Sequence, residues 1–180
     1  MGTGDPRQRL IASAVTLLTE EGVEAVTLRR IARTAGVSHG APLRHFAGRT
    51  ELLSAVAREG FTELGEAELP TATPRERLLA ACRQYLDFAQ RNPAMFELMF
   101  RRDLVDTDDL VKVNGAVFSR FTELVRAAQS AGWRADTDTD ALATSLWAAL
   151  HGLAALSLWG GVTQREVATT LEVTLSTYLD

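Results

Sequence analysis

Four residues in the first third of the chain could contact nucleic acid. His39, Gly40, Arg44 and His45 fall within seven positions, and all four can meet phosphates or base edges. The planar guanidinium of Arg44 can donate to two acceptors of one guanine at once. This set predicts DNA recognition by a short helix that presents the four residues together.

Other reactive residues do not form a catalytic or metal-binding pattern. His39 and His45 are six positions apart, so they point to different faces of one helix and cannot share a metal there. Cys82 has no histidine near it in the sequence, and there is no glycine-rich phosphate loop. We therefore expect no enzyme, no cofactor and no metal site.

Residues 27–46 have the pattern of two short helices joined by a tight turn. Thr27 can cap the first helix, Gly36 stands where a helix ends in a left-handed residue, and Val37 can anchor the turn. Ser38 can cap a second helix that runs to position 46. This spacing is typical of a DNA-reading helix-turn-helix. The apolar residues of the first helix recur at helical period: Leu28, Ile31, Ala32 and Ala35.

This segment resembles the N-terminal signature of the TetR/AcrR transcriptional regulators. The residues that carry the resemblance are Thr27, Leu28, Arg29, Ile31, Ala32, Ala35, Gly36, Val37, Ser38, Gly40, His45, Phe46, Arg49, Leu52 and Leu53. The resemblance implies an all-α fold, with a three-helix N-terminal domain containing the helix-turn-helix and a C-terminal bundle of about six helices that dimerises. It also implies phosphate contacts from Thr27, Ser38 and Arg49. Base edges would be met by His39, Gly40, Leu43 and Arg44, with His45 between the two roles.

Two positions depart from the usual family pattern. Pro42 and Leu43 stand where Leu and Tyr are common, so a tyrosine hydroxyl that often meets a phosphate or base is missing. With Ser38 as the cap, Pro42 would be the fourth helical residue and would forfeit only the first intrahelical bond. These residues support an alternative, a helical small-molecule-binding protein that no longer binds DNA specifically.

The charge distribution divides the chain into two parts. Residues 1–50 contain seven arginines and four acidic residues, a net charge of +3, and the whole chain carries −4, so residues 51–180 carry −7. We predict a DNA-binding domain over 1–50 and an effector-binding and dimerisation domain over 51–180. With one cysteine, no visible secretory signal and no apolar run near the roughly 20 residues that span a bilayer, we expect a cytoplasmic protein without membrane contact.

Start signals recur along the remaining chain and predict further helices. Thr73 and Thr163 are each followed three residues later by glutamate, the pattern of a capping box. The segment from Pro70 to Pro74 is the clearest break, and Gly160 with Gly161 ends a long apolar helix. We expect about nine helices and no strand.

Aromatic and methionine residues in the middle of the chain are candidates for an effector pocket. They can equally form an ordinary core, but flexible and aromatic linings suit small apolar ligands, and family members hold effectors among these helices. Trp147, His151 and Gly152 resemble the Trp-His-Gly type of C-terminal domain. His151 could satisfy a buried polar contact or face the effector. The candidates are Met95, Phe96, Met99, Phe118, Phe121, Trp147 and His151.

The last two helices are apolar on more than one face, so most of their circumference should be buried. The resemblance implies a homodimer formed by these two helices of each chain, although an internal core would produce the same pattern. The helix that begins near Thr50 is the expected lever between effector and DNA. Gly60 within it is either a bending point or a site of close packing.

Overall fold

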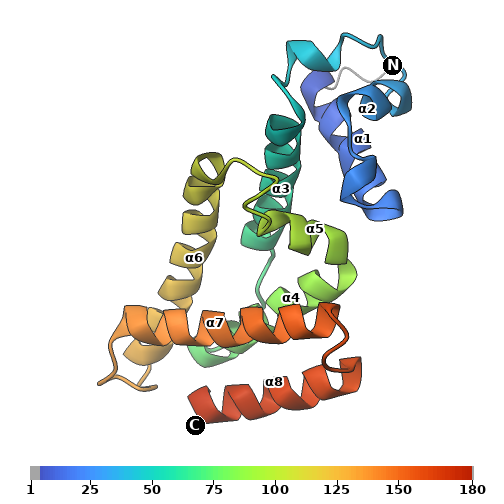
Figure 1. Cartoon of the computed structure of the whole chain (residues 1–180). Helices are drawn as coiled ribbons and strands as arrows, with labels where there is room; N and C mark the ends of the chain where they lie inside the picture. The colour runs from blue at the N-terminus through green and yellow to red at the C-terminus, as the bar shows by residue number, and fades with distance from the viewer. Residues whose placement is uncertain (1–4, 180) are drawn as a thin grey trace. The chain divides into compact units, whose positions relative to one another are not determined.

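A computed structural model describes residues 5–179 of the chain, apart from the side chains of residues 164, 175, 176, 178 and 179. Within that range the chain is all-helical and has no strand, which confirms the predicted fold class (Figure 1). The α-helices are α1 (Pro6–Glu21), α2 (Leu28–Thr34), α3 (Arg49–Glu66), α4 (Pro74–Arg91), α5 (Pro93–Met99), α6 (Thr107–Ser130), α7 (Thr139–Leu158) and α8 (Gln164–Leu179). Two 3₁₀ helices are η1 (Val23–Ala25) and η2 (Pro42–Arg44).

The chain forms two compact units. Unit 1 comprises Met1–Glu63 and Ala94–Asn114, and unit 2 comprises Leu64–Pro93 and Gly115–Asp180. Helices α3 and α6 therefore each contribute residues to both units. The functional boundary between residues 50 and 51 remains a prediction, because it concerns which part of the chain binds which partner.

The predicted start signals operate as capping interactions. The hydroxyl of Thr73 accepts a hydrogen bond from the backbone N–H of Glu76, and the Glu76 carboxylate accepts one from the N–H of Thr73. Thr163 and Glu166 make the same reciprocal pair at the start of α8. Each pair satisfies N–H groups that have no partner inside the helix, so α4 and α8 begin where these residues stand.

The core of unit 1 is built on one face of α1, which packs against α2 and η1. Full burial of one leucine side chain contributes roughly 1.5–3 kcal/mol, so this face stabilises the packing of the N-terminal helices more than the partly exposed ion pair between Arg30 of α2 and Glu21 of α1. Its buried residues recur at helical period: Leu10, Ile11, Ala14, Leu17 and Leu18.

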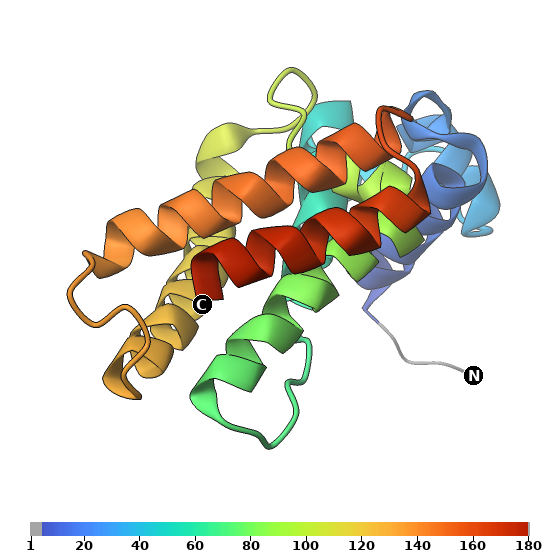
Figure 2. The same ribbon diagram turned by 90° about the horizontal axis from the view of Figure 1, so that it is seen from below.

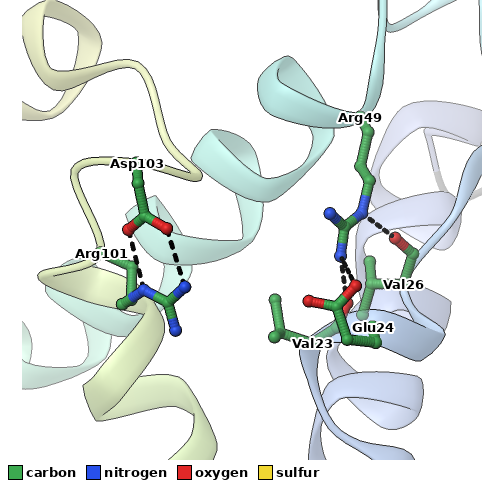
Figure 3. Close-up of polar contacts among 6 residues, drawn as sticks. All are labelled: Val23, Glu24, Val26, Arg49, Arg101 and Asp103. Carbon is green, nitrogen blue, oxygen red and sulfur yellow. Dashed lines mark hydrogen bonds and ion pairs between the residues drawn. The ribbon is translucent and has the colours of Figure 1, made fainter.

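In unit 1, α3 is attached to the loop between α5 and α6 by a buried serine. The Ser54 hydroxyl, which is 0% exposed, donates to the Thr50 carbonyl and accepts from the N–H of Asp106, both at 2.8 Å. In the same loop, Arg101 donates from Nε and Nη2 to both carboxylate oxygens of Asp103 at 2.8 Å (Figure 3). These hydrogen bonds lower the pKa of Asp103 to about 2. The pair is exposed to solvent, so it shapes the loop more than it stabilises the fold.

In unit 2, α7 packs on α4, and α8 runs antiparallel beside α7 (Figures 1 and 2). The buried face of α7 contains Leu142, Leu146, Leu150 and Leu153. By length and composition α7 could cross a membrane, so the expectation that no apolar run approaches that length is wrong. This is weak support for a membrane segment, because core helices pass the same test.

The prediction of an α-helix over residues 38–46 is wrong. The segment is a turn followed by the single 3₁₀ helix η2, whose bonds run from Arg44 N–H to Ala41 O and from His45 N–H to Pro42 O. An α-helix capped at Ser38 would need an N–H at position 42 to reach the Ser38 carbonyl. Proline has no N–H, and its ring clashes with the carbonyl four residues back, so the tighter 3₁₀ turn forms instead.

Candidate nucleic-acid interface and ligand pocket

The turn that follows α2 orients the segment expected to read DNA. Gly36 has a φ of +66°, its N–H donates to the Arg33 carbonyl at 3.2 Å, and the N–H of Val37 donates to the Ala32 carbonyl at 2.9 Å. These two bonds form a Schellman motif, which glycine favours because it has no Cβ to clash at positive φ. Thr27 caps the other end of α2 by accepting from the N–H of Arg30. Both predicted ends of this helix are confirmed.

Residues 38–46 alternate between anchors and exposed groups. The Pro42 and Phe46 side chains are buried, and they hold the segment against the rest of unit 1. Leu43 is 61% exposed although it is apolar, and His45 is half-buried. The remaining predicted contact residues, Ser38, His39, Gly40 and Arg44, are all exposed. The structure therefore leaves the predicted base-reading groups accessible on a short, anchored turn.

Arg49 has internal partners that the sequence did not indicate. Its guanidinium donates to the carbonyls of Val26 at 3.0 Å and Val23 at 2.7 Å, and it pairs with Glu24 at 3.3 Å (Figure 3). These bonds tie the first residue of α3 to η1. The phosphate contact predicted for Arg49 remains a prediction, and its role in holding the domain together is the one visible in the structure.

Two exposed arginines on α2 were missed as candidate DNA contacts. Arg29 and Arg33 lie four residues apart, on the helix that also buries Ile31 and Ala32. Residues at i and i+4 share one helix face, so the two guanidinium groups can meet neighbouring phosphates. Their spacing on the polar side of the predicted helix was the signal that would have found them.

A second site is a pocket formed entirely by unit 2. Its centre is aromatic: the Trp147 ring lies 4.8 Å from Tyr85 and 5.3 Å from Phe121, measured between centroids. Phe118, which does not line the pocket, packs edge-on against Trp147 with 5.7 Å between the ring centroids. The cavity measures about 40 Å³. It is lined by Leu64, Gly65, Ala67, Leu69, Ala81, Gln84, Tyr85, Val117, Arg120, Phe121, Leu124 and Trp147.

The predicted effector residues fall into two groups. Phe121 and Trp147 line this pocket, and Phe118 and His151 contact residues that line it. Met95, Phe96 and Met99 belong to unit 1 and do not line it. Tyr85, Gln84 and Arg120 are lining residues that the sequence analysis does not include, because nothing local in α4 or α6 shows which of their faces meet.

The α5 residues form a separate cluster around Gly60. A Cβ placed on Gly60 would lie 2.7 Å from Sδ of Met99 and 2.8 Å from Cγ of Met95, closer than real contacts allow. Phe100 packs between Phe96, at 5.1 Å, and Phe61, at 5.7 Å between ring centroids. Close packing is therefore what the structure shows at Gly60.

His151 lies beside the pocket rather than in its lining. Its Nδ1 and the Tyr85 hydroxyl form a hydrogen bond of 2.9 Å. Burial lowers the pKa of His151 and raises that of Tyr85, because both charged forms would lose hydration. At neutral pH the pair is uncharged, which suits a buried polar contact next to aromatic rings.

This burial predicts a loss of stability in mild acid. The unfolded chain protonates His151 near pH 6.5 and the folded chain only at lower pH, so the unfolded state binds more protons in that window. The free energy of unfolding should fall as the pH drops below 6.5, and less so in His151→Gln. Urea unfolding of both proteins at about pH 7.5 and about pH 5.5 measures the difference. Equal losses in wild type and variant would contradict it, and His39→Gln, at an exposed histidine, is the matched control.

Two protein-family models match successive segments of the chain. The family model described as "Bacterial regulatory proteins, tetR family" matches residues 10–56. A second model, "Tetracyclin repressor-like, C-terminal domain", matches residues 78–178, more than half of the chain. The Trp-His-Gly subtype expected from Trp147, His151 and Gly152 is not confirmed by this match and stays a prediction.

Similar curated proteins include a nucleoid occlusion factor and an HTH-type transcriptional regulator. The nucleoid occlusion factor SlmA of Glaesserella parasuis is 29% identical over 66% of this chain and 61% of its own length. The transcriptional regulator BetI of Rhizobium meliloti is 37% identical over 43% of this chain and 40% of its own length. The chain thus spans less than two thirds of either relative.

Similar solved structures cover the whole length. A protein of unknown function from Rhodococcus sp. RHA1 has a TM-score of 0.82 at 30% identity and covers 98% of this chain and 97% of its own. BioQ, solved with its double-stranded DNA operator, has a TM-score of 0.67 at 23% identity over 97% of this chain and 98% of its own, and shares the fold. With both family models matched in order along the sequence, the chain belongs to the tetR family of bacterial regulatory proteins.

Proposed function

We propose that this protein is a ligand-responsive DNA-binding transcriptional regulator, more specifically a repressor that a small, mainly apolar effector releases from its operator. The observation that carries the proposal is the exposed, anchored turn bearing His39, Gly40 and Arg44 directly after the Schellman motif. Residues 1–50 would bind DNA, and residues 51–180 would bind effector and dimerise. The family is one of transcription regulators, and we assign no enzymatic role and a cytoplasmic location.

We infer that the functional form is a homodimer joined through α7 and α8. These neighbouring antiparallel helices carry exposed apolar side chains at Leu156 and Val173, and Trp159, directly after α7, is 76% exposed. Large exposed apolar groups on adjacent helices are a feature of interaction surfaces. A two-fold axis through such a pair produces the isologous contact most common among oligomers.

The interface can be tested at Trp159. Replacing Trp159 by glutamate should raise the dimer dissociation constant about 30-fold, since a central tryptophan commonly contributes 2 kcal/mol or more. Val111→Glu, at a residue of similar exposure on α6, should leave dimerisation unchanged. Sedimentation equilibrium measures both. A wild-type protein that is monomeric at micromolar concentration would exclude the dimer.

Operator recognition is tested by selection from random DNA. Two copies of the reading turn related by a two-fold axis should enrich a pseudo-palindrome whose half-sites are separated by about 34–36 Å, one helical turn, or a multiple of it. Selection should be repeated at two stated salt concentrations, because phosphate contacts weaken steeply as ionic strength rises. Enrichment of no sequence would favour the alternative, a ligand-binding protein that has lost specific DNA binding, for which η2 in place of a full helix is the supporting observation.

Release requires an effector that binds one conformation better than another. The shift in DNA affinity cannot exceed the difference between the effector's affinities for the two states. The aromatic pocket of unit 2 is the site we propose for the effector, through Phe121 and Trp147 with Phe118 and His151 behind them. Met95, Phe96 and Met99 would act instead as packing residues of unit 1.

A further inference from the structure

The unit 2 pocket contains one charged side chain. Of its lining residues only Arg120 is ionised, and the lining includes no aspartate, glutamate or lysine. Its other walls are aromatic and aliphatic, from Tyr85, Phe121 and Trp147 to Leu64 and Leu124. An unopposed cation at the edge of an apolar pocket is complementary to a ligand with an apolar body and one negative charge.

Arg120 is held by a backbone carbonyl rather than by a carboxylate. Its Nη2 donates to the Ala67 carbonyl at 2.9 Å, and no acidic side chain of the described residues forms an ion pair with it. Arg126, further along the same helix, pairs with Glu123. A hydrogen bond to a neutral carbonyl is weaker than one to a carboxylate, so a ligand carboxylate can replace it with a gain in free energy.

One part of the pocket wall is a strap, which we define as residues 67–69. Two lining side chains hold it: Arg120 bonds the carbonyl of Ala67, and Nε2 of Gln84 donates to the carbonyl of Glu68 at 2.5 Å. Ala67 and Leu69 themselves line the cavity. The strap begins directly after α3 ends at Glu66. Two polar side chains of the pocket lining are therefore used to hold the strap in place.

The volume of the cavity shows that it must widen to hold an aromatic ligand. About 40 Å³ accommodates a few water molecules, since one water needs roughly 10–15 Å³ measured this way, and a benzene-sized guest occupies a cavity of about 150 Å³. A ring can therefore bind beside Tyr85 and Trp147 only if the pocket wall moves, and the strap is part of that wall.

We propose that Arg120 is the anion-recognition residue of the effector site, and that the effector is a small aromatic carboxylate. Its ring would take the space beside Tyr85, Phe121 and Trp147. Its carboxylate would accept from Arg120, which gives up the Ala67 carbonyl and frees the strap. This proposal rests on the proposed function, because it assigns the chemistry of the same effector site.

The test compares carboxylates with their uncharged amides. Naphthoate and benzoate derivatives, each paired with its primary amide, are titrated by calorimetry into wild type, Arg120→Gln, Arg120→Lys and Arg126→Gln. The carboxylates should bind wild type and raise its Tm, and the amides should bind at least 10-fold more weakly. Arg120→Gln should weaken carboxylate binding about 10- to 100-fold and leave amide binding unchanged. The carboxylate affinity of Arg120→Lys should lie between those of wild type and Arg120→Gln, and that of Arg126→Gln should equal that of wild type.

The unliganded Tm of each variant shows whether the fold is intact, and Arg120→Lys keeps the test valid if the glutamine variant unfolds. Equal binding of acids and amides, equal binding by wild type and Arg120→Gln, or no binding by any carboxylate would overturn the assignment. Operator retention is measured separately. Carboxylates that bind a protein without operator affinity would contradict the proposed function alone, and neutral compounds that release the operator would contradict only the anion assignment.

Discussion

Replacing Phe46 by alanine should lower the free energy of unfolding by about 3–5 kcal/mol. The ring is 1% exposed and closes the segment that carries the reading residues, with the guanidinium of Arg7 above it at 5.1 Å from the ring centroid. The cost combines lost burial with the cavity that remains, because the surrounding core cannot fully collapse into it. Urea unfolding should show a lower midpoint with an unchanged slope.

Leu43→Ala is the matched control for Phe46. The two residues lie in the same turn, but Leu43 is 61% exposed, so its truncation should change stability by no more than about 0.5 kcal/mol. A large loss at Leu43, or a small one at Phe46, would show that the turn packs differently from the arrangement described. Phe46→Ala should also abolish specific operator binding, because the reading turn loses its anchor.

Arg44→Ala should weaken binding to the selected operator by about 1–3 kcal/mol and relax discrimination at one base pair of each half-site. Arg44 is exposed at the end of η2, and its planar fork suits the two major-groove acceptors of guanine. Fluorescence anisotropy with the operator and with single-base variants measures both effects. Arg77→Ala, an exposed arginine of α4 in unit 2, should bind like wild type.

Arg33→Ala separates base reading from phosphate contact. Arg33 is exposed on α2, and its loss should weaken binding to all DNA sequences by the same factor. The slope of log affinity against log salt concentration should become shallower by about one. If Arg44→Ala behaved in this uniform way, Arg44 would be a phosphate contact and another residue of the turn would read the base.

Local signals predicted most helix ends correctly. Thr27, Thr73 and Thr163 cap helices as expected, and Gly36 ends α2 in the left-handed conformation. Such features depend on a residue and its neighbours within four positions, so they can be read from one sequence. The effect of Pro42 is larger than its sequence position predicts. Because it lacks an N–H and its ring clashes with the preceding turn, η2 forms where the family pattern predicts an α-helix.

Long-range packing limited the prediction of the sites. Arg49 was assigned to phosphate because nothing in the sequence places the carbonyls of Val23 and Val26 beside it. Met95 and Met99 have the composition of a pocket lining, yet they fill the space left by Gly60. Arg120 and Gln84 have the sequence context of ordinary surface residues, and their role depends on the carbonyls of the strap. In each case the decisive partner is more than 15 positions away along the chain.

The division into two units has an evolutionary consequence. Every residue of the reading turn belongs to unit 1 and every residue that lines the aromatic pocket belongs to unit 2, so no side chain serves both. Substitutions in the pocket that change effector preference therefore alter no side chain of the reading turn. Likewise, substitutions in the reading turn that change operator preference alter no side chain of the pocket. A lineage that duplicates this gene can diverge in the signal it detects while the copies still govern the same promoters.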